Sequence, residues 1–144
     1  PVGGEIDILE NRGRISNISS SALHFGKQWN KKSTLVGEAL IPRHVRFQDK
    51  FHSISLVWKE NVIAFYLDNS SDPYFTINSD HSEFKKYKYP FNRDYYMILN
   101  VAVGGKYDDY WVDFDAFCND EECSNKEDPD SHRFIIDWIE YERL

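Results

Sequence analysis

The hexapeptide Glu5-Ile6-Asp7-Ile8-Leu9-Glu10 places three carboxylates on a short apolar segment that is predicted to be a β-strand. Side chains alternate between the two faces of a strand, so Glu5 and Asp7 share one face while the two isoleucines occupy the other. Regular alternation would turn Glu10 into the core, where an unpaired carboxylate is costly. A β-bulge between Asp7 and Glu10 removes this conflict, because the extra residue buries Leu9 and returns Glu10 to the face of the other acids. We therefore predict a bulged strand with all three acids on one face.

This crowding of acids has a chemical interpretation. Carboxylates so close repel one another, and such crowding is typical of sites that perform chemistry. Two carboxylates on opposite sides of one bond, with a third adjusting their protonation, are the arrangement that retaining glycoside hydrolysis uses. That mechanism places the two carboxyl groups about 5–5.5 Å apart, which strand twist and the bulge would have to achieve. The alternative is a solvent-facing acidic edge strand, and the bare motif favours this plainer interpretation.

The rest of the chain predicts an all-β fold. Aromatic residues make up 16% of the sequence, and they suit the half-buried surfaces of β-sheets. No amphipathic helix of convincing length is visible, and residues 68–89 are polar and are predicted to be a solvated loop. Trp58 shares a strand face with two aliphatic residues and is predicted to belong to the core. Apolar runs predict strands at 22–25, 34–41, 51–58, 62–67 and 95–103, with a short hairpin turn at 59–61.

Length, charge and hydropathy exclude several classes of protein. The 144 residues are expected to form one domain, and the net charge of −7 without a basic stripe argues against a nucleic-acid partner. No run approaches the roughly eighteen apolar residues of a membrane span. No signal peptide opens the chain.

The segment 108–130 is an acidic insertion that holds both cysteines, Cys118 and Cys123. We expect them to form a tight disulfide in an oxidising compartment, and two cysteines alone are too few for a zinc site. The spacing of a calcium-binding loop is absent, so a solvated acidic loop is the favoured interpretation. Together with glycosylation tripeptides at 17–19 and 69–71, the cysteines favour a secreted, extracellular protein.

The opening hexapeptide resembles the active-site signature of family 16 glycoside hydrolases, the laminarinase-like β-glucanases, and later segments match that family in type and order. These segments are 22–26, the hairpin 51–68, the late run 90–105 and the closing strand 135–141. The resemblance implies an antiparallel β-sandwich of the jelly-roll type with a concave substrate cleft. In that family the signature lies near the middle of the domain. The resemblance therefore implies that residues 1–144 are the C-terminal portion of one catalytic domain, whose missing N-terminal half is the expected partner.

The resemblance also implies roles for individual residues. Glu5 is the nucleophile, Asp7 is its supporting carboxylate, and Glu10 is the general acid that becomes the general base in the second step. No cofactor is needed for catalysis, but Asp137 matches an aspartate that binds structural calcium in some relatives. The remaining implied site residues are substrate-binding side chains at His24, Trp29, Asn100 and Trp111. The residues themselves leave a second interpretation open for His24 and Asn100, a hydrogen bond within the sheet instead of contact with a sugar.

The spacing between Glu5 and Glu10 is the bulged form of the signature, which in the family accompanies laminarinases, agarases and carrageenases. An endo-β-1,3-glucanase acting on laminarin-type glucan by double displacement is therefore the leading hypothesis. Lys106-Tyr107 departs from the laminarinase pattern and leaves the exact substrate open. The alternatives are a glucan-recognition protein without catalysis, and a hydrolase or transglycosylase that acts on mixed-linkage glucan, agar or carrageenan.

Overall fold

The computed structural model describes residues 2–112 and 133–143, which belong to two compact units. The first unit holds residues 2–94 and contains every strand of the described part of the chain. The second unit holds the described residues from 95 onward and contains one short 3-10 helix, η2 (Lys106–Asp108). No helix in the described ranges has the length and apolar character needed to cross a membrane.

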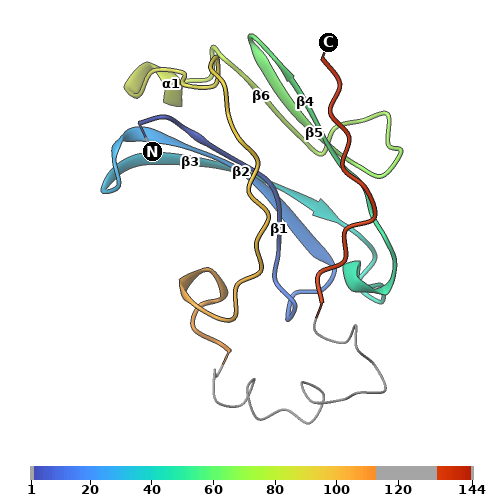
Figure 1. Ribbon diagram of the computed structural model, residues 1–144. Coiled ribbons are helices and arrows are strands. Elements are labelled where there is room, and N and C mark those ends of the chain that lie inside the picture. The colour runs from blue at the N-terminus through green and yellow to red at the C-terminus, as the bar shows by residue number, and fades with distance from the viewer. Residues whose placement is uncertain (1, 113–132, 144) are drawn as a thin grey trace. The chain divides into compact units, whose positions relative to one another are not determined.

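Two antiparallel three-stranded sheets make up the first unit. The first sheet has the order β1 (Glu5–Asn11), β2 (Ile18–Gln28), β3 (Lys31–Leu40). The second has the order β4 (Ile54–Lys59), β5 (Val62–Leu67), β6 (Phe75–Asn78). A 3-10 helix, η1 (Phe47–Asp49), lies in the connection between them, and a single helical turn, α1 (Glu83–Lys86), follows β6. Figure 1 shows the long, bent strands β1–β3 as one layer and β4–β6 as the other. The all-β, antiparallel sandwich predicted from the sequence is confirmed.

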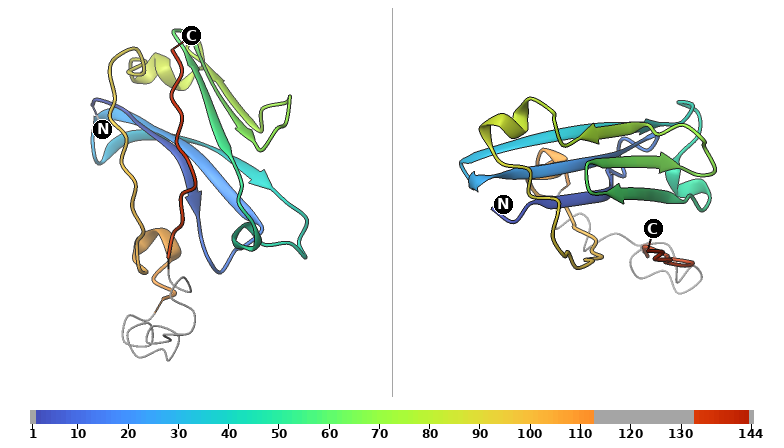
Figure 2. Two further views of the ribbon diagram at one scale, coloured as in Figure 1. Left: turned by 45° about the vertical axis from the view of Figure 1, so that its right-hand side comes forward. Right: turned by 90° about the horizontal axis from the view of Figure 1, so that it is seen from above.

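Figure 2 shows the two layers from two further sides, and both contribute residues to the core of the first unit. Leu23 and Phe25 of β2 and Ile63 and Phe65 of β5 are each 0% exposed. The layers approach closely at Gly37 of β3, where an added Cβ would lie 2.2 Å from Cγ of Phe75. Only a residue without a side chain fits there, so Gly37 sets the spacing between β3 and β6.

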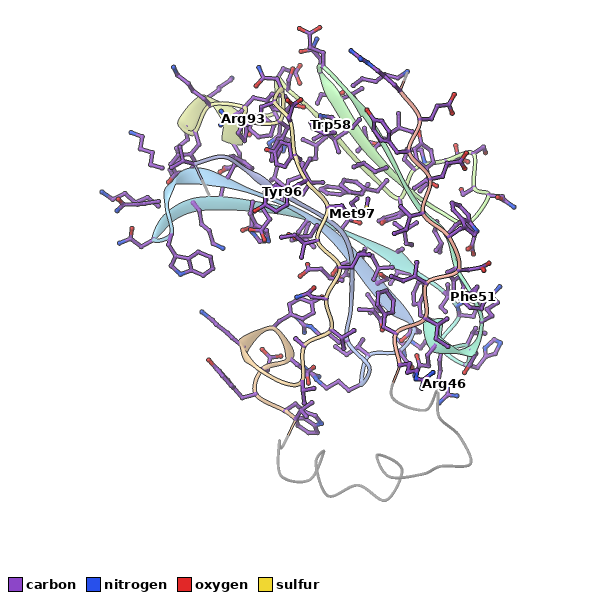
Figure 3. The ribbon with its side chains drawn as sticks, viewed as in Figure 1. Arg46, Phe51, Trp58, Arg93, Tyr96 and Met97 are labelled. Atoms are coloured by element: carbon purple, nitrogen blue, oxygen red, sulfur yellow. The ribbon has the colours of Figure 1, made fainter. Side chains whose placement is uncertain are left out.

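An aromatic cluster closes one end of this core. Part of it comes from residues 68–89, so the prediction of a solvated loop over that segment is wrong. That segment contains β6 and α1, and its residue Phe84 is buried, with its ring centroid 4.6 Å from that of Phe25. Buried Phe91 packs edge-on against both rings. Its carbonyl accepts a hydrogen bond of 2.8 Å from Nε1 of half-buried Trp58, which Figure 3 labels. The polar composition of 68–89 concealed a few apolar anchors, which suffice to order a segment when they reach a core.

Two of the predicted strands are absent from the structure, so these predictions are wrong. Residues 95–103 and 135–141 form no strand, and large apolar side chains such as Tyr96 and Met97 on the first run are exposed (Figure 3). An apolar run becomes a strand only when a neighbouring strand offers hydrogen bonds to its backbone. In the described part of the second unit, the sheet assignment contains no such neighbour.

The hairpin predicted at 51–67 is confirmed, although β4 begins at Ile54 rather than residue 51. Lys59 of β4 pairs with Val62 of β5, so Glu60 and Asn61 form a two-residue turn. The strands predicted at 22–25 and 34–41 are confirmed and are longer than expected, because β2 and β3 pair with each other along nearly their whole lengths.

Candidate active site

The bulge predicted in the opening strand is present. Asp7 pairs with Ala22, and Glu10 pairs with Ser20, so three steps along β1 match two steps along β2. Glu5 pairs with His24. Positions 20, 22 and 24 alternate along β2 and therefore share one face of the sheet, and so do the three acids that lie opposite them.

Leu9 departs from the prediction, because it is 43% exposed instead of buried. The bulge does return Glu10 to the acidic face, but β1 is an edge strand of its described sheet. The side chains of an edge strand have neighbours on one side only, and this reduces the cover that Leu9 receives.

His24 links the acidic strand to β3. Its Nε2 lies 3.1 Å from Oδ2 of Asp7, and its Nδ1 lies 2.8 Å from Oγ1 of Thr34. One ring nitrogen of His24 thus faces the Asp7 carboxylate, and the other is hydrogen-bonded to β3. The hydrogen-bonding interpretation of His24 matches this geometry, and contact with a sugar stays a prediction.

The pKa of Glu10 is raised above the ordinary carboxyl value, first by partial burial, which disfavours the charged form. The negative charges of Asp7 and Glu5 raise it further, while the nearby His24 and Arg12 act in the opposite direction. Glu10 therefore keeps its proton to a higher pH than an isolated glutamate. A proton-holding carboxyl beside two other acids is suited to act as a general acid.

The other predicted site residues are more scattered. Trp29 lies in the turn between β2 and β3, is 73% exposed, and has Nζ of Lys32 4.0 Å from its ring centroid. Asn100, Trp111 and Asp137 belong to the second unit and are exposed. Asn100 lines a hollow of about 630 Å³ with neighbours from 99–101 and 133–136. The substrate contacts proposed for these residues stay predictions.

No cluster of three or more His, Cys, Asp or Glu side chains suited to holding a metal ion occurs within 2–112 or 133–143. Calcium at Asp137 therefore stays a prediction. Cys118 and Cys123 lie outside the described residues, and so does their expected disulfide.

Sequence reasoning missed three residues that support the acidic strand: Thr34, Ser21 and Tyr74. A signal existed for Thr34, because continuing the strand alternation across the β2–β3 hairpin places it opposite His24. For Tyr74 there was none, since its contact with β2 joins two different sheets.

Comparison with known proteins decides the family. The model of the glycosyl hydrolases family 16 matches residues 1–140. The chain belongs to this family. Among its relatives are a glucan endo-1,3-beta-glucosidase A1 from Niallia circulans, 35% identical over 111 residues, and a glucan endo-1,3-beta-glucosidase from Cryptopygus antarcticus, 33% identical over 113 residues. A beta-1,3-glucan-binding protein from Penaeus monodon is 30% identical over 128 residues.

The matched region makes up 73%, 74% and 73% of this chain in these three comparisons. It makes up only 16%, 40% and 34% of the relatives themselves. The matched region therefore spans less than half the length of each of these relatives.

Proposed function

We propose that this family 16 protein is a retaining glycoside hydrolase that cleaves β-1,3-linked glucan internally. One observation carries the proposal: the bulge between Asp7 and Glu10 brings three carboxylates to one face of the sheet, and the pKa of Glu10 is raised there. An ionised carboxylate and a protonated one on the same face are the two groups that the reaction needs.

In the first proposed step, the Glu5 carboxylate attacks the anomeric carbon while Glu10 gives its proton to the glycosidic oxygen, so that the sugar–oxygen bond breaks. The product is a glycosyl ester of Glu5. In the second step, Glu10, now ionised, takes a proton from a water molecule whose oxygen attacks the same carbon and releases Glu5. Water is consumed, and the anomeric configuration is retained.

Asp7 and His24 support both steps. The contact between Nε2 of His24 and Oδ2 of Asp7 holds the Asp7 side chain in place between Glu5 and Glu10. The negative charge of Asp7 helps to raise the pKa of Glu10, which must be protonated when the substrate binds. The proposed chemistry uses Glu5, Glu10 and one water molecule, with Asp7 and His24 in support.

The proposed substrate rests on two lines of support. In the family the bulged spacing of the acids accompanies laminarinases, agarases and carrageenases, and two relatives named glucan endo-1,3-beta-glucosidases favour the first of these. An enzyme acting on such polysaccharides would work outside the cell, in agreement with the secretion proposed from the cysteines and glycosylation tripeptides.

The test is the release of reducing ends by the full-length protein from laminarin, lichenan, agarose and carrageenan. We expect release from laminarin above the other three. The variant Glu5→Gln should abolish turnover while oligosaccharide binding persists, because the amide keeps the shape of the side chain but cannot attack. Undiminished turnover by a purified Glu5→Gln protein would remove Glu5 from the mechanism.

A glucan-binding protein without catalysis is the second candidate, and the Penaeus monodon relative with that name favours it. Calorimetric titration with laminarin oligosaccharides separates the two functions. Binding by the wild-type protein, with no reducing ends released from any of the four polysaccharides, would support recognition alone.

A further inference from the structure

Two hydrogen-bonded hydroxyl groups, from buried Ser21 and half-buried Tyr74, lie beneath the bulge on the opposite face of the sheet from the acids. Oγ of Ser21 donates a hydrogen bond of 2.6 Å to the carbonyl oxygen of Ile8, and it lies 2.5 Å from the hydroxyl of Tyr74. Ser21 is 0% exposed. Tyr74 belongs to the other layer, where its backbone N–H binds the carbonyl of Phe65 in β5. The hydrogen-bonded series Tyr74–Ser21–Ile8 therefore connects the two layers and ends at the bulge.

The direction of these hydrogen bonds is fixed by chemistry. A carbonyl oxygen only accepts, so the single hydroxyl proton of Ser21 is used in the bond to Ile8. Tyr74 must then donate its own proton to Oγ of Ser21. Burial raises the pKa of Tyr74 and so keeps this donor protonated. Bonds arranged donor to acceptor in one line strengthen one another.

The carbonyl at the end of this hydrogen-bonded series belongs to the bulge. Ile8 lies between Asp7 and Glu10, where the register between β1 and β2 shifts, and it has no Cα partner in β2. A bulge disrupts the hydrogen-bond ladder locally, so a side-chain hydrogen bond to its backbone helps to hold it in place. The hydroxyl of Ser21 supplies such a bond from the core side.

We propose that Ser21 and Tyr74 are positioning residues for Glu10, because they hold the bulge that sets where Glu10 lies relative to Glu5. This inference rests on the proposed hydrolase function. It adds two residues that touch neither the sugar nor the reacting atoms. Relaxation of the bulge would turn Glu10 away from the acidic face and leave Glu5 in its regular place at the start of β1.

The kinetic test compares Ser21→Ala and Tyr74→Phe with the wild-type full-length protein on two substrates. One is laminarin, whose leaving group needs a proton, and the other is an aryl β-1,3-glucan oligosaccharide whose phenolate leaves without one. We expect kcat/KM of Ser21→Ala on laminarin to fall by roughly ten- to a hundredfold, the loss typical of a misplaced catalytic group. On the aryl substrate the loss should be several times smaller. Tyr74→Phe should show the same selectivity with a smaller loss.

Tyr89→Phe is the matched control. The hydroxyl of Tyr89 is buried and has no hydrogen-bond partner in the described part of the chain, and the ring packs against Phe84 and Phe91. The Tyr89→Phe substitution removes a buried phenolic oxygen from the same unit and leaves the bulge unchanged. Both substrates should be turned over by Tyr89→Phe as by the wild type.

A double-mutant cycle of melting temperatures tests whether Ser21 and Tyr74 are coupled through their hydrogen bond. Tyr74→Phe should lower the melting temperature of the wild type but leave that of Ser21→Ala unchanged or raise it, because without Ser21 the half-buried phenol has lost its acceptor. If Ser21→Ala does not fold, Tyr74→Phe carries the kinetic test.

Three results count against these proposals in different ways. Equal losses on both substrates would show that the two residues support the fold without positioning Glu10, and additive changes in melting temperature would show that they do not act as one line. A wild-type protein inert on both substrates would instead remove the proposed hydrolase function, and this inference with it.

Discussion

At the scale of single residues, the acid and base roles proposed for Glu10 can be tested separately from the nucleophile role proposed for Glu5. We expect Glu10→Ala to lower kcat/KM on laminarin by roughly 10²–10⁴-fold, the usual contribution of a general acid. An aryl substrate with a good leaving group should be affected far less, because its first step needs no proton. Initial rates on both substrates check this.

Added azide provides the control for that experiment. A small anion can attack the glycosyl ester of Glu5 without help from a base, so it should restore turnover of the aryl substrate by Glu10→Ala and yield a β-glycosyl azide. Glu5→Gln forms no such ester and should not give this product. A Glu10→Ala protein that loses activity equally on both substrates would argue against the acid role.

The raised pKa of Glu10 also predicts a dependence of stability on pH. Partial burial, followed by the charge of Asp7, makes the folded state bind this proton more tightly than the unfolded chain does. Stability is therefore lost as pH rises from the ordinary carboxyl range through the raised pKa. Glu10→Gln removes this ionisation, so it should raise the melting temperature at neutral pH, and the gain should shrink below a pH of about 4.

Thermal melts of both proteins across this pH range make the comparison. The variant Glu60→Gln, in the exposed turn between β4 and β5, is a matched control that should show no such gain. A melting temperature of Glu10→Gln below that of the wild type at neutral pH would mean that ionised Glu10 stabilises the fold.

At the scale of elements, the close approach of β3 and β6 is the feature most sensitive to a single methyl group. A Cβ at Gly37 would overlap the side chain of Phe75. We expect Gly37→Ala to lower the free energy of unfolding by about 1–3 kcal/mol, as overpacking in cores does. Denaturant unfolding measures this.

Gly13→Ala is the control, because a Cβ there meets no other atom within 4 Å. Its effect should stay within about 0.5 kcal/mol, the usual range for surface substitutions. A Gly37→Ala protein as stable as Gly13→Ala would mean that the two layers can move apart at no cost.

The elements also show which predictions a sequence supports. The bulge was predictable because Glu10 has no acceptable place in a regular strand, and the structure has the shift between Asp7 and Glu10. The strand alternation likewise gave the shared face of the three acids. In contrast, β6 and α1 fall in a polar stretch whose buried residue Phe84 is ordered by ring contacts with distant aromatics. Local pattern carries no information about such contacts.

The limits of local pattern also explain why the strands predicted at 95–103 and 135–141 are absent. The apolar composition of 95–103 and 135–141 predicts backbone pairing, but a sequence window cannot say whether a neighbouring strand is at hand. Sequence resemblance could assign His24 to the site, but the structure was needed to show that it binds Asp7 and Thr34.

At the scale of the whole molecule, the state of the two cysteines tests the proposed oxidising compartment. Cys118 and Cys123 are separated by four residues, so a bond between them closes a short loop. The stabilisation expected from a disulfide grows with the length of the loop that it closes, and a short loop adds little to the stability of the fold. We therefore expect the intact mass to increase by two hydrogen atoms on reduction, with only a small fall in melting temperature.

Cys118→Ser supplies the control for this measurement. Its remaining Cys123 has no intramolecular partner, because the sequence holds only these two cysteines, and the mass of the monomer should not change on reduction. An unchanged mass in the wild type would mean two free thiols and would remove the support that the cysteines give to secretion. The hydrolase proposal would stand, since it depends on the face shared by Glu5, Asp7 and Glu10.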